Sequence, residues 1–133
     1  MLRMHLDLYL IKKELEVLDE ILNAKNEGKK LLMIQGGSKI DDKIPILTSL
    51  SDKVNSIYLG GGVMTSLLES DKYKPIIDEI DKKCNVVIAV DGITSEDKYM
   101  NWGIEFDKVE RGTKIYDIGM SSLKDLMILI GIE

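Results

Sequence analysis

The chain has 133 residues, of which 44% are hydrophobic and 31% charged, a composition that suits one folded domain rather than a disordered chain. Its formal net charge of -5 argues against nucleic acid and anionic membranes as partners, because both bind surfaces rich in Lys and Arg. Cys84 is the single cysteine and His5 the single histidine, so we expect neither an internal disulfide nor a cysteine-rich metal site. No run reaches the ~18 apolar residues of a membrane span, and the first residues lack a signal-peptide core. We therefore expect a single cytoplasmic domain over residues 1–133.

The first predicted element is a helix over residues 8–22. Its apolar residues recur at spacings of three and four, which places them on one helical face. This face comprises Leu8, Ile11, Leu15, Leu18 and Leu22, widened by Leu10, Val17 and Ile21. Asp7 is expected to cap the helix, and residues 26–28 to end it. We expect so broad an apolar stripe to face a core, and a surface for a partner is the alternative.

Short buried strands and helices alternate along the rest of the chain. The strands are predicted at residues 31–35, 57–59, 86–90 and 115–118. The helices are predicted at residues 44–51, 63–69, 75–82 and 121–130, the last capped by Ser121 or Ser122. Residues 94–112 read as a polar excursion in which Trp102 and Phe106 cover the edge of the core. Such alternation implies right-handed crossovers, so we predict an α/β fold with a Rossmann-like parallel sheet flanked by helices.

A first glycine cluster follows the first predicted strand, at the edge where ligands bind in folds of this class. It consists of Gly36, Gly37 and Ser38, and it leads into a charged segment that contains Lys39 and Lys43. Glycines expose backbone amides, a helix start adds positive potential, and two lysines four apart can reach one anion. The spacing is not that of a Walker loop. A phosphate site is one interpretation, and a tight turn before a charged helix start is the other.

A second cluster, Gly60-Gly61-Gly62, follows the strand at residues 57–59. Three glycines give a flat wall without side chains, against which a planar ring can lie. They equally permit close packing of a helix on a strand, with no ligand involved.

Together and in order, these segments resemble phosphoglycerate kinase. That family reads Gly-Gly-Ala-Lys-Val-x-Asp-Lys, an amphipathic helix, then hydrophobics and Gly-Gly-Gly-Met, where this chain reads GGSKIDDK, IPILTSLSDKV and YLGGGVM. Upstream, LIKKELEVLDEIL is similar to the family's interdomain helix. Downstream, NVVIAVD is similar to its Val-Asp-Val-Val-Val-Ala-Asp strand, and IYDIGMSSLKDL to its Leu-Asp-Ile-Gly-Pro segment. Residues 10–130 thus resemble the first part of the family's C-terminal, nucleotide-binding domain.

The resemblance implies a site for the magnesium complex of ADP or ATP. By motif position, Lys39 and Lys43 would lie near the nucleotide phosphates. The residues implied for the adjoining turn and for the adenine slot are Gly36, Gly37, Ser38, Gly60, Gly61, Gly62 and, on the opposite side of the slot, Tyr116. The chain departs from the family where Ser38 replaces alanine, Asp41 adds a negative charge, Tyr116 replaces a smaller apolar residue and Met120 replaces proline.

The resemblance also implies missing parts. We expect the domain that binds 3-phosphoglycerate and the last part of the nucleotide domain to be absent from this chain. Phosphoryl transfer depends on positioning and charge neutralisation, so the chain alone is expected not to be an active kinase. Ending the sheet early would expose a strand edge, which a homodimer or a protein partner would cover. The apolar run at residues 126–132 fits such burial, and its folding back as an extra strand is the alternative.

Three functions remain open from the sequence. The first is a nucleotide-binding module of the phosphoglycerate kinase type, and the second is a structural or regulatory interaction protein that kept the fold and lost the nucleotide. The third is an enzyme of altered chemistry that uses Asp91 and the lysines. Asp91 ends a predicted strand, where it can hold magnesium or ribose, or can cap a helix.

Overall fold

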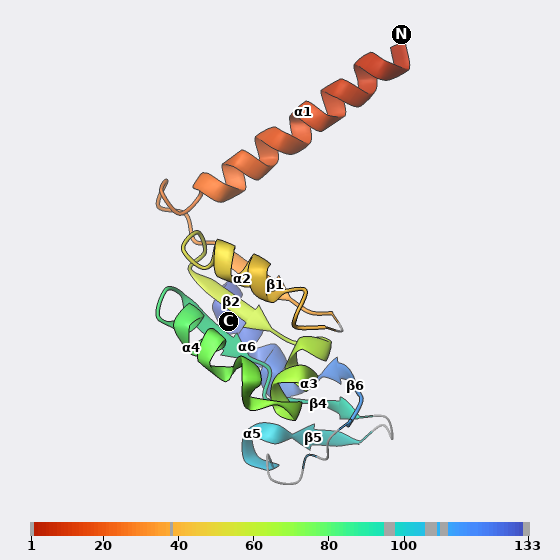
Figure 1. Ribbon diagram of the computed structural model, residues 1–133, viewed down its shortest axis with the longest axis vertical. Helices are drawn as coiled ribbons and strands as arrows, with labels where there is room; N and C mark the ends of the chain where they lie inside the picture. Colours follow the sequence, from red (N-terminus) through yellow and green to blue (C-terminus); the bar gives the residue numbers. More distant parts are fainter. Residues whose placement is uncertain (1, 38, 95–97, 106–108, 110–111, 132–133) are drawn as a thin grey trace.

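The computed structural model describes residues 2–37, 39–94, 98–105, 109 and 112–131. The helices are α1 (Leu2–Asn23), α2 (Ile44–Leu50), α3 (Gly61–Glu69), η1 (a 3-10 turn, Asp71–Tyr73), α4 (Lys74–Asp81), α5 (Trp102–Glu105) and α6 (Met120–Ile130). The strands are β1 (Leu32–Gln35), β2 (Ser56–Leu59), β3 (Asn85–Ile88), β4 (Asp91–Thr94), β5 (Tyr99–Asn101) and β6 (Ile115–Ile118). Figure 1 shows one long helix extending from a body in which helices flank the strands.

The first three strands form the parallel sheet that the sequence predicts. Their order is β1-β2-β3, and Ile57 of β2 lies between Met33 of β1 and Val86 of β3. Each strand is joined to the next through helix, as parallel pairing requires. The prediction of an α/β fold built on such a sheet is confirmed.

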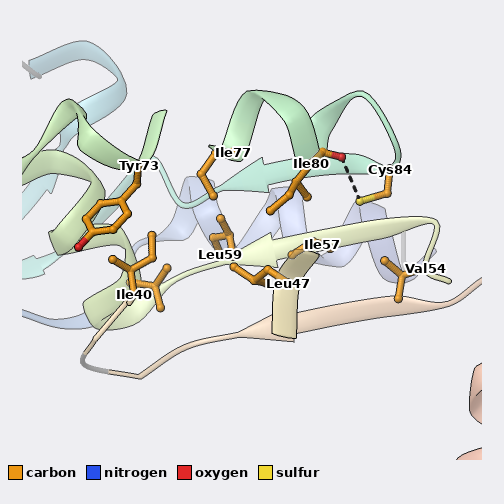
Figure 2. Close-up of a cluster of buried hydrophobic side chains, with 10 residues drawn as sticks. Ile40, Leu47, Val54, Ile57, Leu59, Tyr73, Ile77, Ile80 and Cys84 are labelled. Atoms are coloured by element: carbon orange, nitrogen blue, oxygen red, sulfur yellow. Dashed lines mark hydrogen bonds between the residues drawn. The ribbon is translucent and has the colours of Figure 1, made fainter. Parts of the chain in front are cut away.

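One face of this sheet packs on α2 and α4 (Figure 2). Leu47 of α2 and Ile57 of β2 are fully buried there, and Ile77 and Ile80 arrive from α4. Cys84 lies at the end of this cluster, where its sulfur donates a 3.7 Å hydrogen bond to the carbonyl of Ile80. Burial raises the pKa of the Cys84 thiol, so this cysteine is a core residue rather than an activated nucleophile.

The other face of the sheet packs on α6. Successive residues of a strand point to opposite faces, so Tyr58 lies opposite its neighbours Ile57 and Leu59. Tyr58 belongs to a second buried cluster with Met64 and Trp102, against which α6 packs. The Tyr58 hydroxyl donates a buried 3.1 Å hydrogen bond to the backbone carbonyl of Ser122, which ties α6 to this face.

The strand at Ile115–Ile118 exists, but it does not extend the parallel sheet as predicted. It pairs antiparallel with β4, in a second sheet of order β5-β4-β6. The described residues of the excursion predicted at 94–112 include β5 and α5. Trp102 of α5 is buried, as its predicted role requires, whereas Phe106 lies outside the described residues.

Helix α1 corrects the expectation that its apolar stripe faces a core. It extends away from the body (Figure 1), and its exposed large apolar side chains range from 43% exposed, at Ile21, to 62%, at Met4, whereas Leu22 near its end is partly buried. It begins at Leu2, so Asp7 lies within the helix and is not its cap. At its C-terminal side, Lys25 donates hydrogen bonds of 3.2 and 3.3 Å to the carbonyls of Asp52 and Val54.

Two expectations for the C-terminal segment are also wrong. Residues 126–130 are helical, so they do not fold back as an extra strand. The N-cap of α6 is Gly119 rather than Ser121 or Ser122, and its backbone is extended there. Ile128 is 72% exposed, so the segment is only partly buried.

Candidate functional site

The two glycine turns meet at the carboxyl ends of β1 and β2. The Gly60 amide donates a 3.0 Å hydrogen bond to the carbonyl of Gln35, the last residue of β1. A Cβ atom added to Gly61 would lie 3.4 Å from the Gly37 nitrogen and 3.7 Å from the Gly36 Cα. Gly37 and Gly61 have φ angles of 111° and 58°, in the left-handed region that favours glycine. The turns therefore touch backbone to backbone, which side chains would obstruct.

A cavity of about 300 Å³ opens between these turns and β6. Its lining residues are Ile34, Gln35, Gly36, Tyr58, Gly60, Gly61, Ile115, Tyr116, Asp117, Ile118 and Leu126. Tyr116 borders this cavity and remains 68% exposed, so its ring does not fill the space beside the glycines. A mostly apolar hollow that adjoins exposed glycine backbone suits a flat ring carrying polar edges.

A second cavity, of about 470 Å³, lies on the other side of the start of β6. It is lined by Gly62, Thr65, Ser66, Glu69, Gly112, Thr113, Lys114, Ile115 and Tyr116. Its wall is held by a 3.0 Å hydrogen bond from the Gly112 amide to the Glu69 carboxylate. Ile115 and Tyr116 line both cavities, so the two hollows are neighbours that share one strand.

The structure places the two predicted phosphate lysines differently. Lys43 is half-buried, and its Cε atom lies 3.4 Å from a Cβ added to Gly37, so its stem passes over the first glycine turn. Lys39 is exposed, and its charge acts on the nearby Asp41 carboxylate. Ser38 lies outside the described residues. Of the residues predicted for the site, Gly36, Gly37, Gly60, Gly61 and Tyr116 gather around the first cavity or its turns, and Gly62 lies at the second.

Asp41 has partners that sequence reasoning missed. The Tyr73 hydroxyl donates a 2.7 Å hydrogen bond to Asp41 Oδ1, and Lys72 Nζ lies 3.5 Å from the same oxygen. The hydrogen bond from Tyr73, together with the charges of Lys72 and Lys39, lowers the pKa of the Asp41 carboxyl. The same hydrogen bond raises the pKa of Tyr73. Tyr73 is 32 residues from Asp41 along the chain, and no local pattern links the two.

Asp91, which is far from α6 along the chain, caps the first turn of this helix with its side chain. Its carboxylate is fully buried, and it accepts hydrogen bonds from the Ser121 amide at 2.9 Å and from the Ser122 amide at 2.8 Å. The hydroxyls of Tyr99, at 2.6 Å, and Ser122, at 2.5 Å, also donate to it. Burial by itself would raise the pKa of Asp91, but these hydrogen bonds outweigh it and lower the pKa to about 2. Each carboxylate oxygen thus accepts two hydrogen bonds, which leaves this side chain a structural role rather than a catalytic one.

Neither a metal site nor a membrane span is found in the described part of the chain. No group of three or more His, Cys, Asp and Glu side chains among these residues is placed to hold a metal ion. No helix in the same residues has the length and apolar character needed to cross a membrane.

A parallel sheet with touching glycine turns at its carboxyl edge, and a cavity beside them, defines an α/β protein of the Rossmann-like class. Within this class, a family model for phosphoglycerate kinase matches residues 8–131. The chain belongs to the phosphoglycerate kinase family.

Individual relatives agree with this assignment. The phosphoglycerate kinase of Limosilactobacillus reuteri is 31% identical in an alignment that covers 88% of this chain and 32% of that protein. The enzyme of Clostridium botulinum is 32% identical, with 87% of this chain and 33% of that protein covered. The structure of phosphoglycerate kinase from Coxiella burnetii superposes with a TM-score of 0.72 at 23% identity, covering 91% of this chain and 36% of that one. The chain therefore spans about a third of the length of these proteins.

Proposed function

We propose that this chain binds the magnesium complex of ADP or ATP at the touching glycine turns. The observation that carries this proposal is the contact of Gly61 with the turn at Gly36 and Gly37, beside an open cavity lined by Tyr116. The purine ring lies between the second glycine cluster and Tyr116. Membership of the phosphoglycerate kinase family supports a nucleotide as the ligand of this site.

The phosphates lie toward the segment of residues 39–43. Lys43 passes over Gly37, and Lys39 is exposed on the same segment, so two cations can approach one anion. Backbone amides of the glycine turn add donors that carry no side chain to obstruct the ligand. The departures from the family at Ser38, just before this segment, and at Asp41, within it, alter affinity rather than the class of ligand.

Magnesium arrives with the nucleotide. Phosphate oxygens are the ligands that Mg²⁺ prefers, together with water and one or two carboxylates. Asp91 is not such a carboxylate, because its oxygens already accept hydrogen bonds from α6 and Tyr99. The metal is therefore held chiefly by the bound phosphates.

Nucleotide binding is proposed without phosphoryl transfer by this chain alone. Transfer requires the acceptor to be positioned in line with the phosphate and the developing charge to be neutralised. The described residues that line the cavity beside the glycine turns are the ones proposed here to hold the nucleotide, and we assign none of them to a second substrate. We place this binding activity in the cytoplasm, where the buried thiol of Cys84 stays reduced.

Calorimetric titration with Mg-ADP and Mg-ATP tests the proposal. Saturable binding is expected, and Lys39→Ala is expected to raise Kd at least about tenfold, equivalent to ~1.4 kcal/mol. Lys53→Ala provides a matched control, because it removes another exposed lysine, which lies between α2 and the start of β2, away from the glycine turns. Absence of binding at millimolar nucleotide, or equal affinities of Lys39→Ala and the control, contradicts the proposal.

A second candidate is an interaction protein that keeps the fold and binds a protein instead of a nucleotide. The exposed apolar face of α1 favours this second function, since large exposed apolar patches mark interaction surfaces. The sequence predicted that a partner would cover an edge of the parallel sheet, whereas β6 lies at an edge of the second sheet instead. A homodimer in which α1 faces are buried, combined with no binding of nucleotide, would favour this function over the first.

A further inference from the structure

The segment that carries the two proposed phosphate lysines has one apolar and one polar anchor. The apolar anchor is Ile40, which is 1% exposed and belongs to the buried cluster above the parallel sheet. The polar anchor is Asp41, whose Oδ1 accepts the Tyr73 hydroxyl at 2.7 Å. The backbone amide of Lys43 donates a 2.9 Å hydrogen bond to the Ile40 carbonyl. Both anchors therefore act on one compact turn.

Tyr73 delivers its hydroxyl from a fixed position. Tyr73 is 8% exposed, and it packs in the same cluster as Ile40, beside which Figure 2 shows its ring. A buried ring in a packed core has few alternative orientations, so the hydroxyl stays where the core places it. The Asp41 carboxylate is therefore held by a rigid donor rather than by a flexible surface side chain.

Lys72 completes the arrangement from the same 3-10 turn. Its Nζ lies 4.9 Å from the centre of the Tyr73 ring and 3.5 Å from Asp41 Oδ1. An ionised Asp41 without these partners would compete with a phosphate for Lys39, because the two charges act on each other. Pairing with η1 directs the negative charge of Asp41 toward Tyr73 and Lys72.

We propose that Asp41 and Tyr73 are positioning residues, which hold the 39–43 segment in the conformation that presents Lys39 and Lys43 to a phosphate. Neither residue touches the nucleotide in this arrangement. The inference rests on the proposed function for its ligand, but the hold of Tyr73 on the segment is independent of any ligand.

Tyr73→Phe is the most direct test, because it keeps the buried ring and removes only the hydroxyl. Calorimetry with Mg-ADP is expected to show Kd raised roughly three- to tenfold, as for loss of one hydrogen bond to a charged group. Tyr9→Phe, on exposed α1, is the matched control and should bind as the unaltered protein does. Equal affinities of the two variants would overturn the proposal.

Asp41 gives the rescue that a purely structural role would not. Asp41→Ala removes the acceptor and should weaken binding as Tyr73→Phe does, whereas Asp41→Asn keeps an oxygen for Tyr73 and should restore affinity. Asp41→Ala and Tyr73→Phe each delete the same hydrogen bond. The double variant that combines them should therefore bind Mg-ADP no more weakly than either single variant. Additive losses in the double variant would count against a shared hold.

Hydrogen exchange separates this proposal from the nucleotide assignment. The amides of Lys43 and Ile44 donate to the Ile40 carbonyl at 2.9 and 3.0 Å, and both should exchange faster in Tyr73→Phe without any ligand. The amide of Val87 in β3 serves as the internal reference for global stability. If these amides exchange faster in Tyr73→Phe but the unaltered protein binds no nucleotide, only the proposed function is contradicted, and the positioning role stands. Unchanged exchange at Lys43 and Ile44 would overturn the positioning role whatever the nucleotide result.

Discussion

At the scale of single residues, the buried carboxylate of Asp91 shows how one charge organises two parts of the fold. It satisfies the first amides of α6, which the helix itself cannot pair, and it complements the positive end of that helix. Tyr99 of β5 donates to the same carboxylate, so the second sheet and α6 share one acceptor. Gly119 is required beside it, since a Cβ there would lie 2.4 Å from the carboxylate.

The lowered pKa of Asp91 makes stability depend on pH in a defined direction. Its pKa is about 2 in the folded protein against 3.8 for an ordinary Asp side chain, so ionisation favours the folded state. This contribution is fully present above pH 3.8, and it is lost as pH falls through about 2. The difference corresponds to about 2 kcal/mol of unfolding free energy.

Urea unfolding of Asp91→Asn at pH 6 and pH 2.5 measures this contribution. The variant is expected to be less stable than the unaltered protein by at least about 2 kcal/mol at pH 6, because it loses acceptors for α6 and Tyr99. The difference should shrink at pH 2.5, where part of Asp91 is protonated in the unaltered protein. Asp78→Asn, on the exposed side of α4, is the control. A difference that stays constant with pH would contradict the assigned role.

At the scale of elements, the local spacing of apolar residues predicted individual helices and strands, but not how all of them pair. The sequence predicts β1 and β2 from contiguous apolar residues, and α4 from apolar residues at helical spacing. In the structure, apolar residues of all three elements pack together in one buried cluster. β4 was missed because its buried residues include Asp91 and Thr94, which do not read as a strand. The direction of β6 is set by its antiparallel pairing with β4, a strand that no window around residues 115–118 contains.

The sequence predicts some features of the candidate site but not others, for the same reason. Its glycine turns could be located in the sequence, since strand ends followed by glycines are a local signal. The contact of Tyr73 with Asp41 could not, because it joins segments 32 residues apart through the packing of a buried ring. The face of α1 was predicted correctly as apolar, but periodicity does not say what covers a face.

The exposed face of α1 predicts association in solution. Leu8, Ile11, Leu15 and Leu18 lie on one side of the helix and are more than half exposed, so their burial against another surface is favourable by the hydrophobic effect. Light scattering at tens of micromolar is expected to show a dimer or larger species, and Leu15→Lys should shift it toward the monomer. Glu16→Lys, which also introduces a lysine into α1 but on its polar side, is the control. A monomer for the unaltered protein at these concentrations would contradict self-association through α1.

At the scale of the whole molecule, the candidate site lies where the two sheets meet. The glycine turns belong to the carboxyl end of the parallel sheet, whereas Tyr116 and Ile118 come from β6 of the antiparallel sheet. A ligand in this cavity would contact both sheets at once. Its binding free energy therefore couples two parts of the fold that otherwise meet through α6 and the second buried cluster.

Hydrogen exchange with and without saturating Mg-ADP tests this coupling. A ligand at 100 times its Kd stabilises the folded protein by about 2.7 kcal/mol, so slower exchange is expected wherever opening of the site exposes an amide. Protection should appear at Gly60 and Gly61 and also along β6, because both line the cavity, while α1 should exchange at its original rate. Protection confined to the glycine turns would place the ligand outside the cavity, with only its phosphates bound. Protection of β6 together with the turns would show that the ring occupies the space between the sheets, where Tyr116 rather than a smaller side chain forms the opposite wall.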